Sequence, residues 1–305
     1  MNVYIDETFF NHALMEKFIK HYPTLHLLDE QHISQAELLI VSPKMVKRDL
    51  LERMNNLKFI KLLTAGYDTV DLTYVKENKI PIAYAKDVFS IQIAEDVFAK
   101  ILYFNRKLGS YHEQSVQQKW TFIPSRHEIY LKHVLIVGAG SIGYEIALRM
   151  KAFGAHVTGY KKRLLESSIY DHLIYETEEL YHALTKADYV ILCLALNEKT
   201  YHFVDETFLN HMKKEALLIN VARGDIIDQD ALIVALNEER IRGAALDVTS
   251  PEPLPFDHPL WRAKNIFITP HQASSSPMMK ERLMHEVIDT LDKFLQGQAL
   301  PNLIR

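Results

Sequence analysis

The segment VLIVGAGSIG, residues 134–143, constrains the fold more than any other part of the chain. Four apolar residues lead into a G-x-G-x-x-G pattern at Gly138, Gly140 and Gly143, and an amphipathic stretch, EIALRMKAF, follows it. A turn of this kind between a strand and a helix lets backbone amides approach a pyrophosphate, whose negative charge the helix N-terminus favours. The segment therefore predicts a parallel α/β domain that binds a dinucleotide.

Short apolar runs alternate with amphipathic stretches on both sides of this turn. Before it come NVYI, LHLL, AELLIVS, LKFIKLLT and IPIAYA, and after it come HVTGY, DYVILCLAL, ALLINVA and GAALDV. This rhythm is typical of parallel strands joined by crossover helices. We expect an α/β protein with parallel sheets in two domains, each Rossmann-like or flavodoxin-like.

Two helical patterns indicate where the domains join. Residues 91–108, IQIAEDVFAKILYFNRKL, should lead into the second domain, and residues 278–295, MMKERLMHEVIDTLDKFL, should return to the first. We therefore expect a substrate domain of residues 1–93 and 277–305, with a nucleotide-binding domain of residues 94–276 inserted into it. Residues 111–130 show no clear period and are expected to form an arm.

Composition disfavours several other classes of protein. The formal net charge of -4 is spread over segments of mixed sign, which offers no basic face for a nucleic acid. The N-terminus shows no signal-peptide pattern, and the longest apolar run, residues 190–196, is too short to span a bilayer. Cys193 is the only cysteine, so an intrachain disulfide and a cysteine-based zinc cluster are excluded, and we predict no metal site. A cytoplasmic protein is the expectation.

The end of the strand HVTGY bears on the choice of cofactor. An acid about 20 residues beyond the glycine pattern commonly bonds the ribose 2′-hydroxyl of NAD. Here Lys161, Lys162 and Arg163 follow the strand, and a basic cluster can pair with a 2′-phosphate that a carboxylate would repel. We expect NADP to be preferred to NAD, and the alternative is a solvated basic turn.

Three polar segments follow later strands, where open α/β sheets bind ligands. They are INVARGDIIDQDAL with Arg223, GAALDVTSPEPLP with Asp247 and Glu252, and IFITPHQAS with His271. This order, behind a glycine pattern that begins only at residue 138, resembles the D-isomer-specific 2-hydroxyacid dehydrogenases. The resemblance covers nearly the whole chain, because TAGYDTVDL, IAED and HPLW are also present.

The chemistry explains why these residue types occur together. Reduction of a 2-keto acid needs a group that binds the carboxylate, a hydride donor and an acid that protonates the developing alkoxide. Arg223 offers a planar fork for the substrate carboxylate and carbonyl. His271 would be the general acid, and Glu252 beside it would favour the imidazolium. The resemblance implies these roles, and it implies that Asp247 contacts the nicotinamide carboxamide.

The resemblance also implies binding residues outside this group. Backbone amides at Ala65 and Gly66 should receive the substrate carboxylate, with Tyr67 beside them. Further cofactor contacts are expected from Ser141, Ile142, Leu194, Ala195, Thr200, Val221 and Ala222.

Two departures from the family pattern narrow the interpretation. Residues 195–197, Ala-Leu-Asn, stand where the family often has Pro-Leu-Thr, and Thr249 and Ser250 stand where an aromatic residue and an acid are common. Together with the basic residues at the end of the strand HVTGY, these departures make the chain most similar to the glyoxylate and hydroxypyruvate reductase branch. The expected arm, and the usual assembly of the family that the chain resembles, indicate a homodimer. A phosphoglycerate dehydrogenase is the enzymatic alternative. A nicotinamide-sensing corepressor is the alternative from another class.

Overall fold

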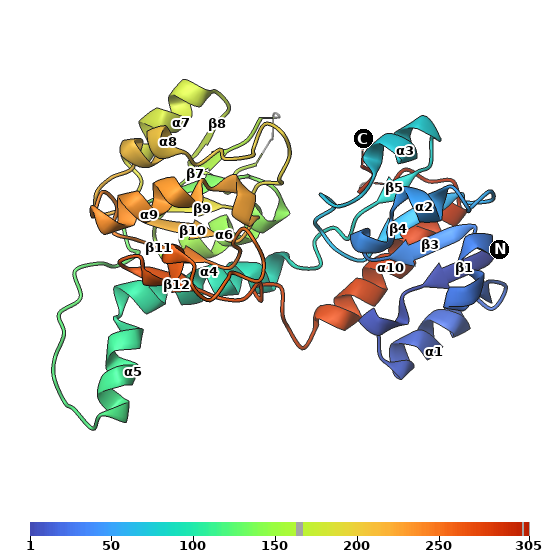
Figure 1. Ribbon diagram of the computed structural model, residues 1–305, viewed down its shortest axis with the longest axis horizontal. Helices are drawn as coiled ribbons and strands as arrows, with labels where there is room; N and C mark the ends of the chain where they lie inside the picture. The colour runs from blue at the N-terminus through green and yellow to red at the C-terminus, as the bar shows by residue number, and fades with distance from the viewer. Residues whose placement is uncertain (163–166, 301, 305) are drawn as a thin grey trace. The chain divides into compact units, whose positions relative to one another are not determined.

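The computed structural model describes residues 1–162, 167–300 and 302–304. The chain folds into two compact units (Figure 1). Unit 1 comprises Met1–Phe89 and Ser276–Arg305, and unit 2 comprises Ser90–Ser275. The sequence predicts divisions after residues 93 and 276, and the units divide after residues 89 and 275.

Unit 1 contains a five-stranded parallel sheet. Its strand order, β2-β1-β3-β4-β5, is that of flavodoxin-like domains. All four residues of β3 and of β4 are buried, as in parallel sheets covered on both faces. The strands are β1 (Asn2–Ile5), β2 (His26–Leu27), β3 (Leu38–Val41), β4 (Phe59–Leu62) and β5 (Ile82–Ala83), and the helices are α1 (His12–His21), α2 (Arg48–Leu51), α3 (Leu72–Glu77) and α10 (Met279–Leu295).

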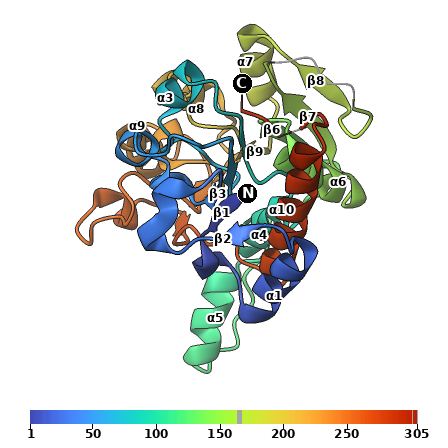
Figure 2. The same cartoon turned by 90° about the vertical axis from the view of Figure 1, so that its right-hand side faces the viewer.

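The last helix, α10, packs within unit 1, where it lies beside α1 (Figure 2). Asp292 of α10 accepts hydrogen bonds from the Tyr22 hydroxyl at 2.8 Å and from the His21 ring at 3.1 Å. The rings of Phe59 in β4 and Phe294 in α10 stack with centroids 4.3 Å apart. The chain therefore completes the core of unit 1 with its last helix.

Unit 2 is a doubly wound domain around a seven-stranded parallel sheet. Its strand order is β12-β11-β10-β9-β6-β7-β8, so the direction of winding reverses at β6. The predicted α/β class with parallel sheets is confirmed for both units. The strands are β6 (His133–Val137), β7 (His156–Tyr160), β8 (His172–Ile174), β9 (Tyr189–Leu192), β10 (Leu217–Asn220), β11 (Gly243–Leu246) and β12 (Ile266–Ile268); the helices are α4 (Ser90–Asn105), α5 (Leu108–Val116), α6 (Ser141–Ala152), α7 (Thr177–Leu184), α8 (Glu206–His211) and α9 (Gln229–Asn237).

Two elements of unit 2 differ from the sequence-based expectation. The strand β8 was not predicted, because its three residues carry no extended apolar run. The expected arm, residues 111–130, is not irregular throughout, since it begins inside α5. This helix has no buried residue, so it lacks the apolar periodicity that would reveal it. Figure 1 shows α5 projecting from the body of unit 2 before a long loop returns to β6.

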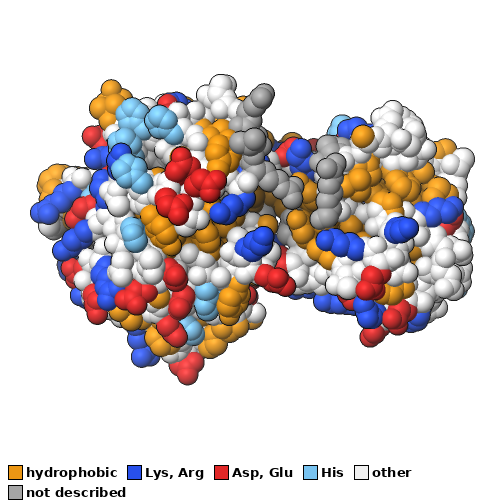
Figure 3. Space-filling view, turned by 90° about the horizontal axis from the view of Figure 1, so that it is seen from above, with side chains coloured by type: hydrophobic (Ala, Val, Ile, Leu, Met, Phe, Trp, Pro, Cys, Tyr) orange, Lys and Arg blue, Asp and Glu red, His pale blue; other side chains and the backbone are white. Residues whose placement is uncertain are grey.

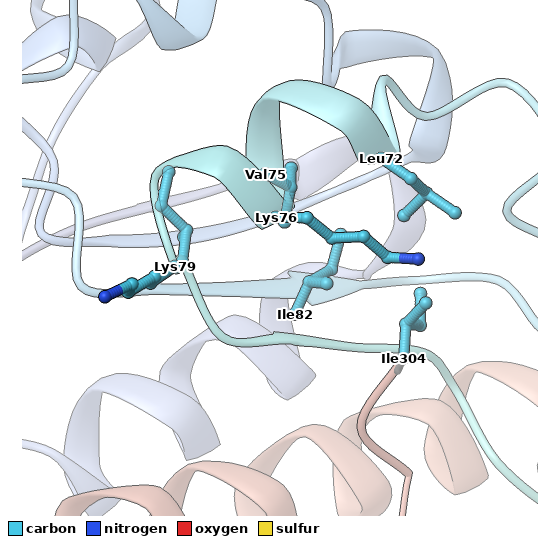
Figure 4. Close-up of a pocket in the computed structure, with 7 residues that line it drawn as sticks. Leu72, Val75, Lys76, Lys79, Ile82 and Ile304 are labelled. Atoms are coloured by element: carbon cyan, nitrogen blue, oxygen red, sulfur yellow. The ribbon is translucent and has the colours of Figure 1, made fainter.

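The surface and cavities add little to the candidate site. No helix of the described residues is long and apolar enough to cross a membrane. On the face seen in Figure 3, acidic, basic and histidine side chains are intermingled over unit 2. Unit 1 contains a cavity of about 410 Å³ lined by side chains from α3, β5 and the C-terminal segment (Figure 4). None of the residues singled out by the sequence lines it.

Candidate active site

His271 and Glu252 are neighbours beyond the carboxyl ends of β11 and β12. Nδ1 of His271 lies 2.8 Å from Oε2 of Glu252, and Oε1 of the same carboxylate accepts a 3.2 Å hydrogen bond from the Thr249 N–H. The two side chains are 47% and 39% exposed, so both can be reached from outside unit 2. Because Glu252 engages Nδ1, Nε2 is the ring atom left to exchange a proton with a substrate.

The backbone of His271 adopts a conformation that surrounding groups must hold. Its φ is +50°, in the left-handed region, which costs a residue with a Cβ about 1 kcal/mol. The His271 N–H donates to the carbonyl of Asp247 at 2.7 Å and to that of Thr269 at 3.0 Å. The turn after β12 therefore sets the direction of the imidazole.

The Asp247 side chain stabilises this turn through hydrogen bonds. Its side chain is 2% exposed and accepts hydrogen bonds from the Thr269 hydroxyl at 2.6 Å and from the N–H groups of Gln272 and Ala273 at 3.0 and 2.9 Å. Both carboxylate oxygens are thus already engaged within unit 2. The contact between Asp247 and the nicotinamide carboxamide stays a prediction, because it would have to be added to these bonds.

Sequence reasoning missed one buried partner of Asp247. Lys100 in α4 is 1% exposed, and its Nζ lies 3.7 Å from Oδ1 of Asp247. The available signal was a charged pair at i and i+4, Asp96 and Lys100, within a helix whose other residues are mainly apolar.

Arg223 lies in the loop after β10, and this loop packs against the loop that carries Glu252. A Cβ at Gly224 would lie 2.1 Å from the carbonyl carbon and oxygen of Thr249, so only glycine allows this approach. Asn220 shapes the loop by donating to the Arg223 carbonyl at 2.9 Å and accepting from the Ala222 N–H at 3.0 Å. Unit 2 thus brings together three loops that are far apart in the sequence.

The glycine turn after β6 fits a pyrophosphate. Gly138 has φ +113°, and a Cβ there would meet the Cys193 carbonyl at 2.7 Å, while a Cβ at Gly143 would meet the Gly138 carbonyl oxygen at 2.5 Å. A Cβ at Gly140 would meet nothing within 4 Å. Gly140 is also the N-cap of α6 and provides no side-chain cap, so the N–H groups of the first turn, which include Ser141 and Ile142, can face an anion.

The other residues expected at the cofactor lie at the same edge of the sheet. Leu194 and Ala195 follow β9, and Val221 and Ala222 follow β10. Thr200 closes the loop after β9, since its hydroxyl donates to the Ala195 carbonyl at 2.8 Å. The loops follow β9, which pairs with β6, and β10, which pairs with β9, so they lie to one side of the point where the order of strands reverses and doubly wound sheets bind their ligands.

Cys193 also lies in this loop but is not a nucleophile. Its Sγ donates a 3.0 Å hydrogen bond to the Gly138 carbonyl. Burial raises the pKa of the thiol to about 12, so the reactive thiolate is scarcely populated at neutral pH.

Lys161, the first of the basic residues after β7, contacts the glycine turn. Nζ of Lys161 donates to the carbonyl of Ala139 at 3.1 Å, and Nζ of Lys162 lies 5.5 Å from the centre of the Tyr160 ring. Arg163 lies outside the described residues. Among the residues that the structure describes, no group of three or more His, Cys, Asp or Glu side chains could hold a metal ion.

Ala65, Gly66 and Tyr67 belong to unit 1, in the loop after β4. The Thr64 hydroxyl donates to the Gly66 carbonyl at 2.7 Å, and the Tyr67 ring lies 5.9 Å from that of Tyr84. Neither the Ala65 nor the Gly66 N–H donates a hydrogen bond within the described part of the chain. Two such amides can receive a carboxylate.

Residues 98–273 match the family described as D-isomer specific 2-hydroxyacid dehydrogenase, NAD binding domain. A glyoxylate reductase from Korarchaeum cryptofilum is 31% identical over 264 residues, which cover 85% of this chain and 79% of the relative. The human glyoxylate reductase/hydroxypyruvate reductase is 32% identical over 278 residues, which cover 88% of this chain and 83% of the relative.

A longer relative and a solved structure broaden the comparison. A D-3-phosphoglycerate dehydrogenase from Methanocaldococcus jannaschii is 31% identical over 276 residues, which cover 90% of this chain but 52% of that protein. The solved structure of an acyclic imino acid reductase in complex with NADPH and D-Arg is similar with a TM-score of 0.88. Its sequence identity is 26%, and the match covers 100% of each chain.

Proposed function

Because the chain belongs to the D-isomer specific 2-hydroxyacid dehydrogenase family and is therefore an NAD(P)-dependent oxidoreductase, we propose that it reduces a small 2-keto acid of the glyoxylate or hydroxypyruvate kind to the D-2-hydroxy acid. The observation that carries the proposal is the 2.8 Å contact between His271 Nδ1 and Glu252 Oε2. That pair lies beside the loop of Arg223, at the edge of the sheet that bears the glycine turn.

In this proposal His271 is the general acid. Nε2 gives its proton to the carbonyl oxygen of the keto acid as negative charge develops there, and it takes the proton back in the reverse reaction. Glu252 accepts the Nδ1–H bond, orients the ring and stabilises its protonated form. When bound, the nicotinamide cofactor supplies the hydride.

Arg223 is proposed to bind the substrate carboxylate and carbonyl through its planar guanidinium group. Its position in the loop held by Asn220 and Gly224 favours this role, because the loop lies against the one that carries Glu252. The amides of Ala65 and Gly66 are proposed to receive the carboxylate as well, with Tyr67 shaping the pocket for the substrate side chain.

NADPH is the proposed cofactor, held by the glycine turn and by Lys161 and Lys162, with Arg163 as a further candidate. Lys161 already reaches the glycine turn through the Ala139 carbonyl, which supports a place near the adenosine ribose. Measurement of kcat/KM with NADPH and NADH tests this assignment. A kcat/KM for NADPH that is equal to or lower than the kcat/KM for NADH would contradict it.

A homodimer is the proposed assembly, with α5 and the following loop as its arm. Val116, Trp120 and Phe122 are more than 70% exposed, and large apolar side chains in this segment would gain from burial against a second copy. Sedimentation at micromolar concentration should give a species of twice the chain mass. A single species of 35.4 kDa would argue against the dimer.

A substrate panel and one variant test the reaction itself. Glyoxylate, hydroxypyruvate and phosphohydroxypyruvate are offered to the full chain with each cofactor, and the D-hydroxy product is identified by chiral chromatography. His271→Gln should lower kcat at least about 100-fold and leave the Kd for NADPH within about twofold. Turnover of this variant at the normal rate would remove His271 from the mechanism. Cofactor binding without turnover of any acid by the unmodified chain would favour a sensor of the corepressor kind.

A second substrate class is favoured by one comparison, the similarity to the acyclic imino acid reductase. An imine presents the same planar carbon to hydride but a nitrogen in place of the carbonyl oxygen. The panel is therefore repeated with ammonia or methylamine added to each keto acid. Faster NADPH oxidation with amine, and an amino acid as product, would assign the chain to imine reduction instead.

A further inference from the structure

Three polar side chains of α4, spaced four residues apart, contact either the segment that carries His271 or Asp247, which holds that segment. Gln92 Nε2 donates to the Ser274 carbonyl at 3.2 Å, and Asp96 Oδ1 accepts from Gln272 Nε2 at 2.6 Å. Lys100 Nζ lies 3.7 Å from Asp247 Oδ1. A four-residue spacing places all three on one side of the helix, so this side of α4 faces both the segment and Asp247.

The charges in this contact are largely withdrawn from water. The side chains of Lys100, Asp247 and Asp96 are 1%, 2% and 11% exposed, and Lys100 also donates to Asp96. Burial raises the pKa of Asp96, and the bond from Lys100 opposes that rise. An ammonium between two carboxylates costs desolvation free energy that an apolar side chain would avoid.

The apolar neighbours on α4 show that this cost is not imposed by packing. Ile93, Val97 and Ile101 are buried on the same helix, so α4 fills comparable buried positions with apolar side chains. The buried charges of Asp96, Lys100 and Asp247 therefore need another explanation. The residues to which the two carboxylates are hydrogen-bonded provide one.

Those partners are the two residues that follow His271. The main chain of Gln272 and Ala273 is held by Asp247, and the side chain of Gln272 is held by Asp96. His271 itself has φ +50°, a conformation that relaxes unless neighbouring contacts fix it.

We propose that Asp96, Lys100 and Gln272 are positioning residues for His271. Lys100 holds the carboxylates of Asp96 and Asp247 in place, and these hold the turn that points the imidazole at Glu252. The proposal rests on the proposed function of His271 as general acid. None of the three residues needs to touch the substrate, so their loss should lower the fraction of molecules with a correctly placed imidazole.

Substitution of Gln272 and Asp96 tests the proposal through kinetics. Gln272 is exposed at the surface of unit 2, so Gln272→Ala should fold normally, and Asp96→Asn changes charge with little change of shape. Each should lower kcat about tenfold or more and leave the KM for NADPH within about twofold. Asp230→Asn, at an exposed position of α9, is the matched control and should behave as the unmodified chain.

A double-mutant cycle separates positioning from a general loss of structure. If Gln272 and Asp96 act through His271, their substitution in the His271→Gln background should lower the residual rate by less than about twofold. A further tenfold loss in that background would overturn the proposal. So would normal kcat in both single variants when His271→Gln alone is impaired, whereas a fully active His271→Gln would overturn the proposed function.

Amide hydrogen exchange on the full chain provides a readout that needs no turnover. A peptide spanning residues 269–274 should exchange at least about fivefold faster in Gln272→Ala and in Asp96→Asn than in Asp230→Asn. Unchanged exchange in both variants would show that α4 does not hold the turn. Lys100→Met should reproduce the faster exchange if it folds, and the two other variants decide the question if it does not.

Discussion

The carbonyl of Thr249 occupies the space that a Cβ would take at Gly224, with only 2.1 Å between that position and the carbonyl carbon and oxygen. The loop of Arg223 therefore lies directly on the loop that leads to Glu252. The group proposed to bind the substrate and the carboxylate proposed to orient His271 are joined here by backbone packing.

Gly224→Ala should damage folding and activity together, because the added methyl group collides with backbone that cannot rotate away. We expect a loss of about 2–3 kcal/mol in the free energy of unfolding and a thermal midpoint roughly 5–10 °C lower. Calorimetry and steady-state kinetics on the same preparation measure both effects. A variant with the normal midpoint and normal kcat would show that the two loops can separate freely.

Gly140→Ala should separate cofactor binding from folding. A Cβ at Gly140 meets no atom within 4 Å, so the thermal midpoint without cofactor should change by less than about 2 °C. The methyl group would enter the space in front of α6 where the pyrophosphate is proposed to lie, and the Kd for NADPH should rise about tenfold, or roughly 1.4 kcal/mol. Unimpaired NADPH binding, measured by fluorescence titration, would place the pyrophosphate elsewhere.

Glu252→Gln should lower kcat and preserve the structure. The amide can still accept the hydrogen bond from the Thr249 N–H, but it carries no charge to stabilise a protonated His271. We expect kcat for the keto acid to fall about 100-fold, with the KM for NADPH within about twofold. Glu238→Gln, in an exposed pair with Arg240, is the control that should retain activity. Equal rates for the two variants would contradict the proposed role of Glu252.

The α/β class and most strands could be predicted from the sequence, because buried parallel strands are continuous apolar runs. The runs at β3, β6, β9 and β10 are of this kind. The three-residue strand β8 escaped prediction, since its pairing with β7 is a tertiary contact that no local pattern records. The solvent-facing helix α5 was not predicted either, because it buries no side chain and therefore shows no apolar periodicity.

For the candidate site, the order of the motifs along the chain indicates which residues to examine. It does not show which packing contacts and ion pairs hold those residues in place. The GxGxxG pattern identified the turn, and spacing could not show that Gly138 and Gly143 are required by packing while Gly140 faces open space. The pairing of Lys100 with Asp247 joins residues 147 positions apart in the sequence, and a lysine inside a helical pattern ordinarily indicates a solvated face.

Removal of one partner from the buried ion pair between Lys61 and Glu286 should destabilise unit 1. Lys61 is fully buried in β4, and its Nζ lies 2.6 Å from Oε2 of Glu286 in α10 and donates to the Tyr84 carbonyl at 2.9 Å. Lys61→Met leaves Glu286 without its cation and should cost about 3 kcal/mol, whereas Lys61→Met with Glu286→Leu should cost less than either single change. Thermal unfolding followed by circular dichroism tests this order. A double variant weaker than both singles would mean that the pair contributes net stability.

Asp188 should make unit 2 sensitive to acid. Burial tends to raise the pKa of this carboxyl, but the bonds from Lys213 at 2.5 Å and from the His133 N–H at 2.9 Å outweigh it and hold the pKa below its ordinary value of 3.8. A depressed pKa in the folded state means that the unfolded chain binds the proton more readily. The contribution to stability is therefore complete above the ordinary pKa and is lost as the pH falls through the lower, folded value.

Asp188→Asn should accordingly lower the free energy of unfolding by about 1 kcal/mol at pH 7, and the difference from the unmodified chain should shrink below about pH 4. Both tryptophans, Trp120 and Trp261, lie in unit 2, so urea unfolding followed by their fluorescence reports on this unit. Asp257→Asn, at an exposed position, is the control and should show no such dependence. If the loss caused by Asp188→Asn were the same at pH 7 and pH 3, the ionised carboxylate would not be the stabilising species, and the bond from the His133 N–H alone would account for the effect.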